Sequence, residues 1–157
     1  MARVAESVVV GAPLADTWAL YFDARRWPSW VDGFGGVEAA DGYPEVGGSL
    51  RWHSVPAGRG TVTERVLEHD PRRRHRIAFD DPESEGELTT SFAIEPGTGG
   101  ATATRVTQEL EYRLRRRGPF VWLTDRLFIR AQLRASMQRS LARFAAEAGE
   151  RPWGPDR

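Results

Sequence analysis

The chain has 157 residues and carries 22 basic and 22 acidic side chains, so its formal net charge is zero. A length of this order is typical of one domain, and the absence of cysteine excludes disulfides, thiolate metal sites and a cysteine nucleophile. Every basic residue is an arginine, which excludes Schiff-base chemistry on a lysine and a P-loop, while the charge balance argues against sequence-independent binding of nucleic acid.

The same sequence contains no apolar run of the roughly 20 residues that span a bilayer. Its first residues also lack the apolar core of a signal peptide. We therefore expect a soluble cytoplasmic protein with no membrane span and no nucleic-acid partner.

The N-terminal segment predicts one strand and two short helices. Residues 3–10 are rich in valine and predict a first strand, which residues 11–13 interrupt. Pro13 is expected as the first residue of a helix, because its missing N–H would be unpaired there in any case. Leu14 and Trp18 recur at helical spacing, so this helix should run to about residue 23, and a further helical turn is predicted over 27–31.

From Gly33 onward, glycine and Asp-Pro or Asp-Gly turn signals recur at short intervals. Short stretches with strand propensity lie between them, and such close spacing favours an antiparallel meander over β-α-β units. The predicted strands cover residues 34–40, 49–55, 59–68, 73–80, 86–95 and 101–114.

Three of these strands alternate with a period of two, which indicates one covered and one wet face. The side chains expected to face inward are Val106, Gln108, Leu110 and Tyr112, then Leu88, Thr90, Phe92 and Ile94, then His75, Ile77 and Phe79. The strand over 59–68 has two possible phases, and the pattern alone does not choose between them. One phase buries Val62, Glu64 and Val66, and the other buries Thr61, Thr63, Arg65 and Leu67.

Residues 120–148 contain no glycine or proline and predict one long helix. Its apolar stripe comprises Leu123, Leu127, Leu133, Met137, Leu141, Phe144 and Ala148. The ridge formed by Arg126, Arg130 and Arg134 is expected to face solvent, and residues 149–157, with two prolines, are expected to form a flexible tail.

Local motifs in this order give the chain a family resemblance over residues 3–148. They are Ala12-Pro13, Thr17-Trp18, the segment 23–30, Val46-Gly47-Gly48, the segments 66–71 and 104–107, and Gly118-Pro119. The chain resembles the START-like (SRPBCC) superfamily, and within it the polyketide cyclase/dehydratase and lipid-transport group. The resemblance implies one α+β helix-grip domain over residues 1–148. In that fold a curved antiparallel sheet of about seven strands, two short helices after the first strand and one long C-terminal helix enclose a hydrophobic cavity.

The resemblance also implies a small hydrophobic ligand, such as a polyketide, a lipid or an aromatic metabolite, and no cofactor. Two functions stay open: an enzyme that cyclises or dehydrates a poly-ketone, and a carrier or sensor without turnover. A third hypothesis is a protein-interaction module. Many members of the superfamily dimerise, but nothing in this sequence requires a homodimer.

Carried over residue by residue, the resemblance turns Thr61, Thr63 and Arg65 toward the cavity. Arg65 would then stabilise the oxyanion of an enolate, while Thr63 or Gln108 would relay protons. His75 is a further acid–base candidate because of its inward phase. His53 and His69 show no ligand spacing with His75, so no metal site is predicted.

The remaining expected ligand contacts are mainly aromatic. Phe34 takes a position where related cyclases carry a tyrosine, and Ser136 one where they carry an asparagine, and both departures favour the carrier. The full set of expected ligand contacts is Trp27, Trp30, Phe34, Trp52, Thr61, Phe79, Thr90, Phe92, Val106, Gln108, Gln132, Leu133 and Ser136.

Overall fold

A computed structural model of the chain describes residues 1–55, 60–115 and 128–150. Seven antiparallel strands form one sheet in the order β1-β7-β6-β5-β4-β3-β2, so that only β1 crosses to the far edge. The strands are β1 (Ala2–Val10), β2 (Phe34–Asp41), β3 (Ser49–Ser54), β4 (Thr61–Asp70), β5 (Arg74–Asp80), β6 (Ser84–Pro96) and β7 (Thr102–Leu114). The helices are α1 (Leu14–Tyr21), α2 (Trp27–Trp30) and α4 (Arg130–Glu150), and a 3-10 turn covers Ala24–Arg26.

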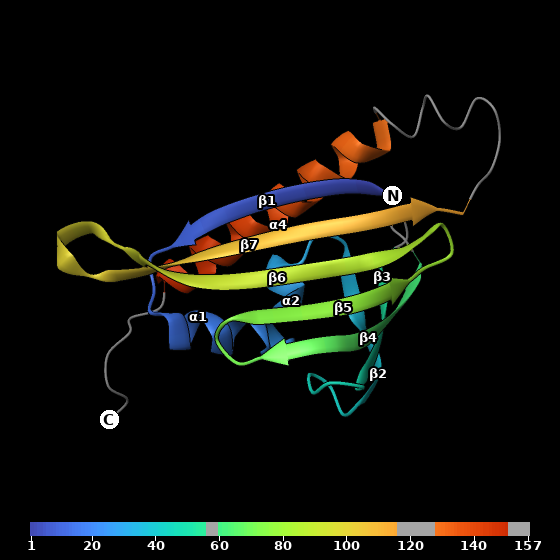
Figure 1. Cartoon of the computed structure of the whole chain (residues 1–157), viewed down its shortest axis with the longest axis horizontal. Coiled ribbons are helices and arrows are strands. Elements are labelled where there is room, and N and C mark those ends of the chain that lie inside the picture. The colour runs from blue at the N-terminus through green and yellow to red at the C-terminus, as the bar shows by residue number, and fades with distance from the viewer. Residues whose placement is uncertain (56–59, 116–127, 151–157) are drawn as a thin grey trace.

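The helices gather on one side of the curved sheet (Figure 1), and α4 runs along β1 and β7 on that side. This is the predicted α+β helix-grip arrangement, with the meander of strands and the two short helices after β1 in their predicted order. No described helix is long and apolar enough to cross a membrane.

The first helix begins one residue later than predicted. Pro13 has φ −58° and ψ 154°, which is an extended conformation, so Pro13 caps the helix instead of opening it. Its carbonyl oxygen accepts the N–H of Thr17 at 2.9 Å. After α1, the Asp23 carboxylate accepts the N–H of Arg25 at 3.2 Å and starts the 3-10 turn that leads into α2.

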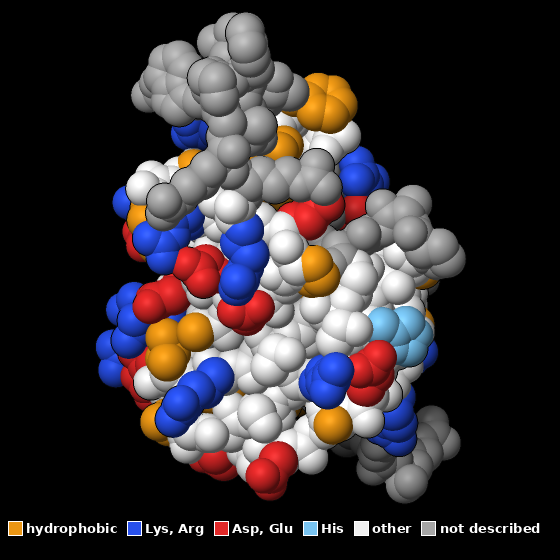
Figure 2. All heavy atoms as spheres, turned by 90° about the vertical axis from the view of Figure 1, so that its right-hand side faces the viewer, with side chains coloured by type: hydrophobic (Ala, Val, Ile, Leu, Met, Phe, Trp, Pro, Cys, Tyr) orange, Lys and Arg blue, Asp and Glu red, His pale blue; other side chains and the backbone are white. Residues whose placement is uncertain are grey.

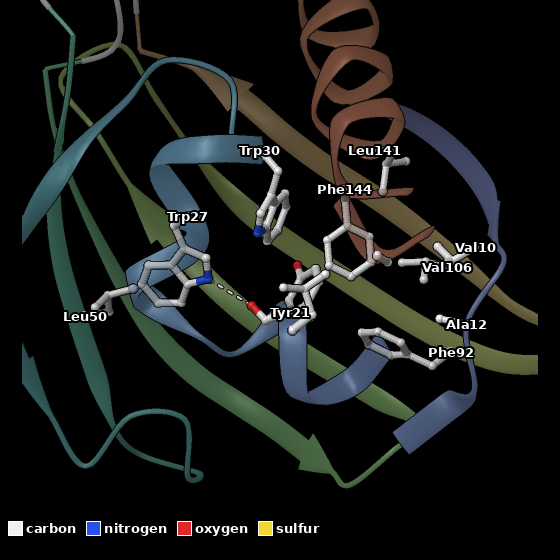
Figure 3. Packing of buried hydrophobic residues seen from close by; sticks show 12 residues of the cluster. Val10, Ala12, Tyr21, Trp27, Trp30, Leu50, Phe92, Val106, Leu141 and Phe144 are labelled. Atoms are coloured by element: carbon white, nitrogen blue, oxygen red, sulfur yellow. Dashed lines mark hydrogen bonds between the residues drawn. The ribbon is translucent and has the colours of Figure 1, made fainter. Parts of the chain in front are cut away.

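The core lies between α4 and the centre of the sheet (Figure 3). Val10, Val106 and Phe144 are fully buried, and Leu141 is 2% exposed. On α4 the predicted apolar stripe is buried at Met137, Leu141, Phe144 and Ala148. Leu123, Leu127 and Arg126, and the tail from residue 151 on, lie outside the described residues. Arg130 is exposed as expected, and Arg134 pairs with Glu6 at 3.1 Å.

One inward prediction on β6 is wrong. Leu88, Thr90 and Phe92 face the helices, but Ile94 is 65% exposed. It lies toward the end of the β6–β7 hairpin, which projects beyond the helices in Figure 1, so no element covers it.

The phase of β4 is the opposite of the one that the resemblance favours. Val62 and Val66 are each 1% exposed, and Glu64 lies between them on the inner face. Thr63 and Arg65 are exposed on the outer face. Because apolar side chains lose more by exposure to water than threonine or arginine do, the two valines decide which face is buried.

A β-bulge then reverses the phase of the strand. Val66 pairs with Ile77, but Glu68 pairs with Arg76, so Leu67 is an extra residue on β4. Such an insertion moves the following side chains to the opposite face. As a result His69 faces inward, directly across from His75 on β5.

Candidate ligand cavity

A cavity of about 910 Å³ lies between the inner face of the sheet and α4. Side chains from α2, from strands β2 to β7 and from α4 line it. Ten of the expected ligand contacts lie along its wall: Trp27, Trp30, Phe34, Trp52, Phe79, Thr90, Gln108, Gln132, Leu133 and Ser136. Their contact with a ligand stays a prediction.

Three expected contacts do not line the cavity. Thr61 shares the outer face of β4 with Thr63 and Arg65. Phe92 and Val106 point inward, but they belong to the packed core beside Phe144 (Figure 3). The rings of Trp18 and Tyr21 cover Phe92, with centroid distances of 4.9 and 5.3 Å, and separate it from the cavity.

The placement of Arg65 and Thr63 in the cavity is therefore wrong. Both side chains lie on the exposed face of the sheet, on the far side of the backbone from the cavity. Since an oxyanion hole requires donors within hydrogen-bond distance of the reacting oxygen, Arg65 does not supply one for a ligand in this cavity.

His75 does reach the cavity wall. It is 3% exposed, and its Nε2 lies 3.4 Å from the hydroxyl of Tyr43, which also lines the cavity. Its Nδ1 lies 3.0 Å from Nδ1 of His69, a proximity that the sequence spacing did not predict because the bulge creates it. Burial, followed by the neighbouring His69, lowers the pKa of His75 to about 4, so its imidazole is neutral at pH 7.

These two histidines do not make a metal centre with other side chains. Within the described ranges, no group of three or more His, Cys, Asp or Glu side chains is placed to hold a metal ion. His53 lies apart on β3, half-exposed and 3.7 Å from Glu38.

A second polar cluster is centred on the hydroxyl of Tyr21. This oxygen lies 2.9 Å from Thr90 Oγ1 and accepts a hydrogen bond from Gln108 Nε2 at 3.2 Å. Burial raises the pKa of Tyr21, so the phenol stays protonated and can donate to Thr90. The cluster fixes two polar side chains of the cavity wall on neighbouring strands.

Glu64 places a carboxylate in the wall between these clusters. Its Oε1 accepts the indole N–H of Trp52 at 2.8 Å. Burial raises the pKa of Tyr43 well above its ordinary value, and the negative charge of Glu64 adds to that shift. The wall thus combines a carboxylate, a protonated phenol and a neutral imidazole, which are groups that can accept and donate protons.

At the rim, Asp32 ties the loop after α2 to α4. Asp32 Oδ2 accepts from Ser136 Oγ at 2.7 Å and from Arg139 at 2.8 Å, and the Asp32 N–H donates to Ser140 Oγ at 2.9 Å. The hydrogen bond from Arg139 is the main reason that the pKa of Asp32 is lowered. Ser136, expected as a ligand contact, is therefore engaged by Asp32.

Sequence reasoning missed several polar groups of the wall. Tyr43 lies in the connection between β2 and β3, where no periodicity marks its direction. Asp32 lies in the loop that follows α2. Glu64 belonged to the phase of β4 that was not chosen, and the signal that could have found it was the pair of valines on either side.

Comparison with known proteins agrees with this architecture. The family model described as polyketide cyclase/dehydrase and lipid transport matches residues 1–149. A search of curated protein sequences found no match.

Solved structures share the fold at low sequence identity. An aromatase/cyclase from Streptomyces is 19% identical, with a TM-score of 0.70 over 94% of this chain and 93% of that one. Norcoclaurine synthase from Thalictrum flavum is 17% identical, with a TM-score of 0.67 over 96% and 94%. A conserved protein from Geobacillus kaustophilus is 10% identical, with a TM-score of 0.69 over 94% and 95%. By its family match over residues 1–149, the chain belongs to the polyketide cyclase/dehydrase and lipid-transport family of the START-like superfamily.

Proposed function

We propose that this protein binds one small hydrophobic molecule with a polar group in the cavity between the sheet and α4. The observation that carries the proposal is the cavity itself, whose volume of about 910 Å³ lies within the range of small-molecule sites. Apolar and aromatic side chains form most of its wall, and the polar groups converge on the side of the sheet.

The polar groups are held in place before any ligand arrives. Thr90 is 1% and Gln108 is 6% exposed, and both are fixed by the Tyr21 hydroxyl. A ligand would therefore lose little binding energy in ordering them. A protein-interaction module with a vestigial cavity would have a filled interior, so the cavity counts against that hypothesis.

The binding proposal is tested by filling the cavity. Leu133 is a half-buried wall residue on α4, so Leu133→Trp should occupy the space that a ligand needs. Gln138→Trp is the matched control, because Gln138 is exposed on the same helix and outside the cavity wall. We expect 2-naphthylmethanol, followed by calorimetry, to bind the wild type and the control but not Leu133→Trp. Absence of binding to the wild type, or equal loss in both variants, would contradict the proposal.

A second candidate function is acid–base turnover of a poly-ketone, which the pairing of Tyr43 with a neutral His75 favours. In an aldol closure, a base removes a proton from the carbon between two carbonyls, and that carbon bonds to a second carbonyl carbon. The resulting alkoxide then takes a proton. In this cavity Glu64 would be the base and Tyr43 the proton donor, with His75 returning the proton to Tyr43.

Mass spectrometry of the extract from denatured protein separates turnover from carriage. A recovered poly-ketone that the purified protein then converts supports turnover, and Tyr43→Phe should slow that conversion while binding is kept. Conversion at an unchanged rate in Tyr43→Phe would remove the proposed acid. A recovered lipid that is released unchanged supports the carrier.

A further inference from the structure

The charges that line the cavity are strongly biased toward one sign. Among the described lining residues the guanidinium of Arg139 faces four carboxyl groups, which belong to Asp32, Glu64, Asp81 and Glu83. The outer surface shows no such bias, since acidic and basic side chains lie next to each other on the face in Figure 2. The negative bias is therefore a property of the cavity.

Three of the four carboxyl groups have evident roles elsewhere. Asp32 binds Arg139 and Arg143 at the rim. Asp81 accepts the N–H and the hydroxyl of Ser84, at 2.7 and 2.9 Å, and so stabilises the turn before β6. Glu83 lies in the same turn and is exposed to solvent.

Glu64 differs because it lies in the middle of β4, within an aromatic part of the wall. Its partner Trp52 has its ring centroid 5.4 Å from that of Phe34. The ring of Trp27 is in turn 5.9 Å from Phe34 and 5.9 Å from Tyr43. Four rings in contact thus form a continuous surface with a carboxylate bound to one of them.

This combination is suited to an organic ammonium ion. A cation gains from the negative faces of aromatic rings, most of all from those of tryptophan, and it gains further from a carboxylate in a site shielded from water. The charge of Glu64 reaches across the cavity, since it contributes to the raised pKa values of both Tyr21 and Tyr43, after the larger effect of burial. The carbonyl oxygen of a neutral ketone gains nothing from a carboxylate, and an anion is repelled by it.

We infer that the cavity prefers a hydrophobic amine in its protonated form, with the ammonium group at Glu64 and the apolar part against Trp27, Phe34 and Trp52. This inference rests on the proposed ligand binding and narrows the class of ligand. It assigns the choice of ligand charge to one side chain.

Two probes of nearly equal shape test the inference. 2-Naphthylmethylamine is a cation at pH 7, and 2-naphthylmethanol is neutral. We expect calorimetry to show at least tenfold tighter binding of the amine to the wild type, which corresponds to about 1.4 kcal/mol. Glu64→Gln should bring the two affinities close together and leave the affinity for the alcohol nearly unchanged.

Glu83→Gln is the matched control, because it removes an exposed carboxylate from the rim of the same cavity. It should keep the preference of the wild type. Equal binding of both probes to the wild type would overturn the inference, and this measurement does not require Glu64→Gln to fold. A preference that persists in folded Glu64→Gln would overturn it as well. If neither probe binds the wild type, the proposed binding function itself fails, which is a separate result.

Discussion

Replacing Tyr21 by phenylalanine tests whether the buried polar cluster stabilises the fold. Tyr21→Phe keeps the ring, whose centroid lies 5.3 Å from that of Phe92 and 5.2 Å from that of Trp30, and removes only the hydroxyl. The change breaks the 2.9 Å contact with Thr90 and the 3.2 Å hydrogen bond from Gln108. Both partners are then left buried, at 1% and 6% exposure.

The expected cost follows from those two partners. A hydrogen bond contributes about 0.5–1.5 kcal/mol net, and a buried polar group left without a partner costs about 1–3 kcal/mol. Gln108 lines the cavity and can turn toward water there, so we take about 2 kcal/mol for the loss in free energy of unfolding. At roughly 2–4 °C per kcal/mol for a chain of this length, Tm should fall by about 4–8 °C.

Urea denaturation followed by tryptophan fluorescence measures this loss, with an unchanged m-value as evidence that the native state is intact. Thr90→Val removes the partner, so the double variant should lose less stability than the sum of the two single variants. A loss below about 0.5 kcal/mol in Tyr21→Phe, or strict additivity in the double variant, would refute the reasoning.

Two further predictions concern pH and packing. Because the pKa of His75 is about 4 when folded and near 6.5 when unfolded, the unfolded state takes up the proton first as the pH falls. Up to about 3 kcal/mol of stability should therefore be lost between pH 6.5 and 4, and His75→Gln should flatten that dependence in urea titrations; equal slopes would contradict it. A Cβ at Gly86 would lie 2.0 Å from the Glu111 carbonyl oxygen, so Gly86→Ala should cost about 1–3 kcal/mol. Gly11→Ala, with nothing within 4 Å, should have little effect on Tm, and similar losses in both variants would count against the packing argument.

The sequence was sufficient to predict the fold and most of the inward faces. On β7, Val106, Gln108 and Leu110 alternate with charged or hydroxyl residues, and only one phase buries the apolar set. On β5 the same argument turned His75 inward. Where burial is the dominant free-energy term and one phase is clearly more apolar, alternation is enough to predict direction.

Alternation was not enough for β4. Both of its phases contain an apolar residue and a charged one, so the resemblance decided the prediction and chose the wrong face. The bulge at Leu67 depends on pairing with β5, and a single strand carries no sign of that pairing. The same limit applies to Tyr43, whose position depends on how the β2–β3 connection folds back over the sheet.

The extra residue in β4 gives the two ends of that strand opposite numbering rules. Before Leu67, even-numbered side chains such as Glu64 face the helices, and after it the odd-numbered His69 does so. Substitutions can therefore change the carboxylate end and the imidazole end of the strand independently. Loss of the single residue Leu67 would instead exchange inside for outside along one half of the strand, so this position tolerates replacement far better than deletion.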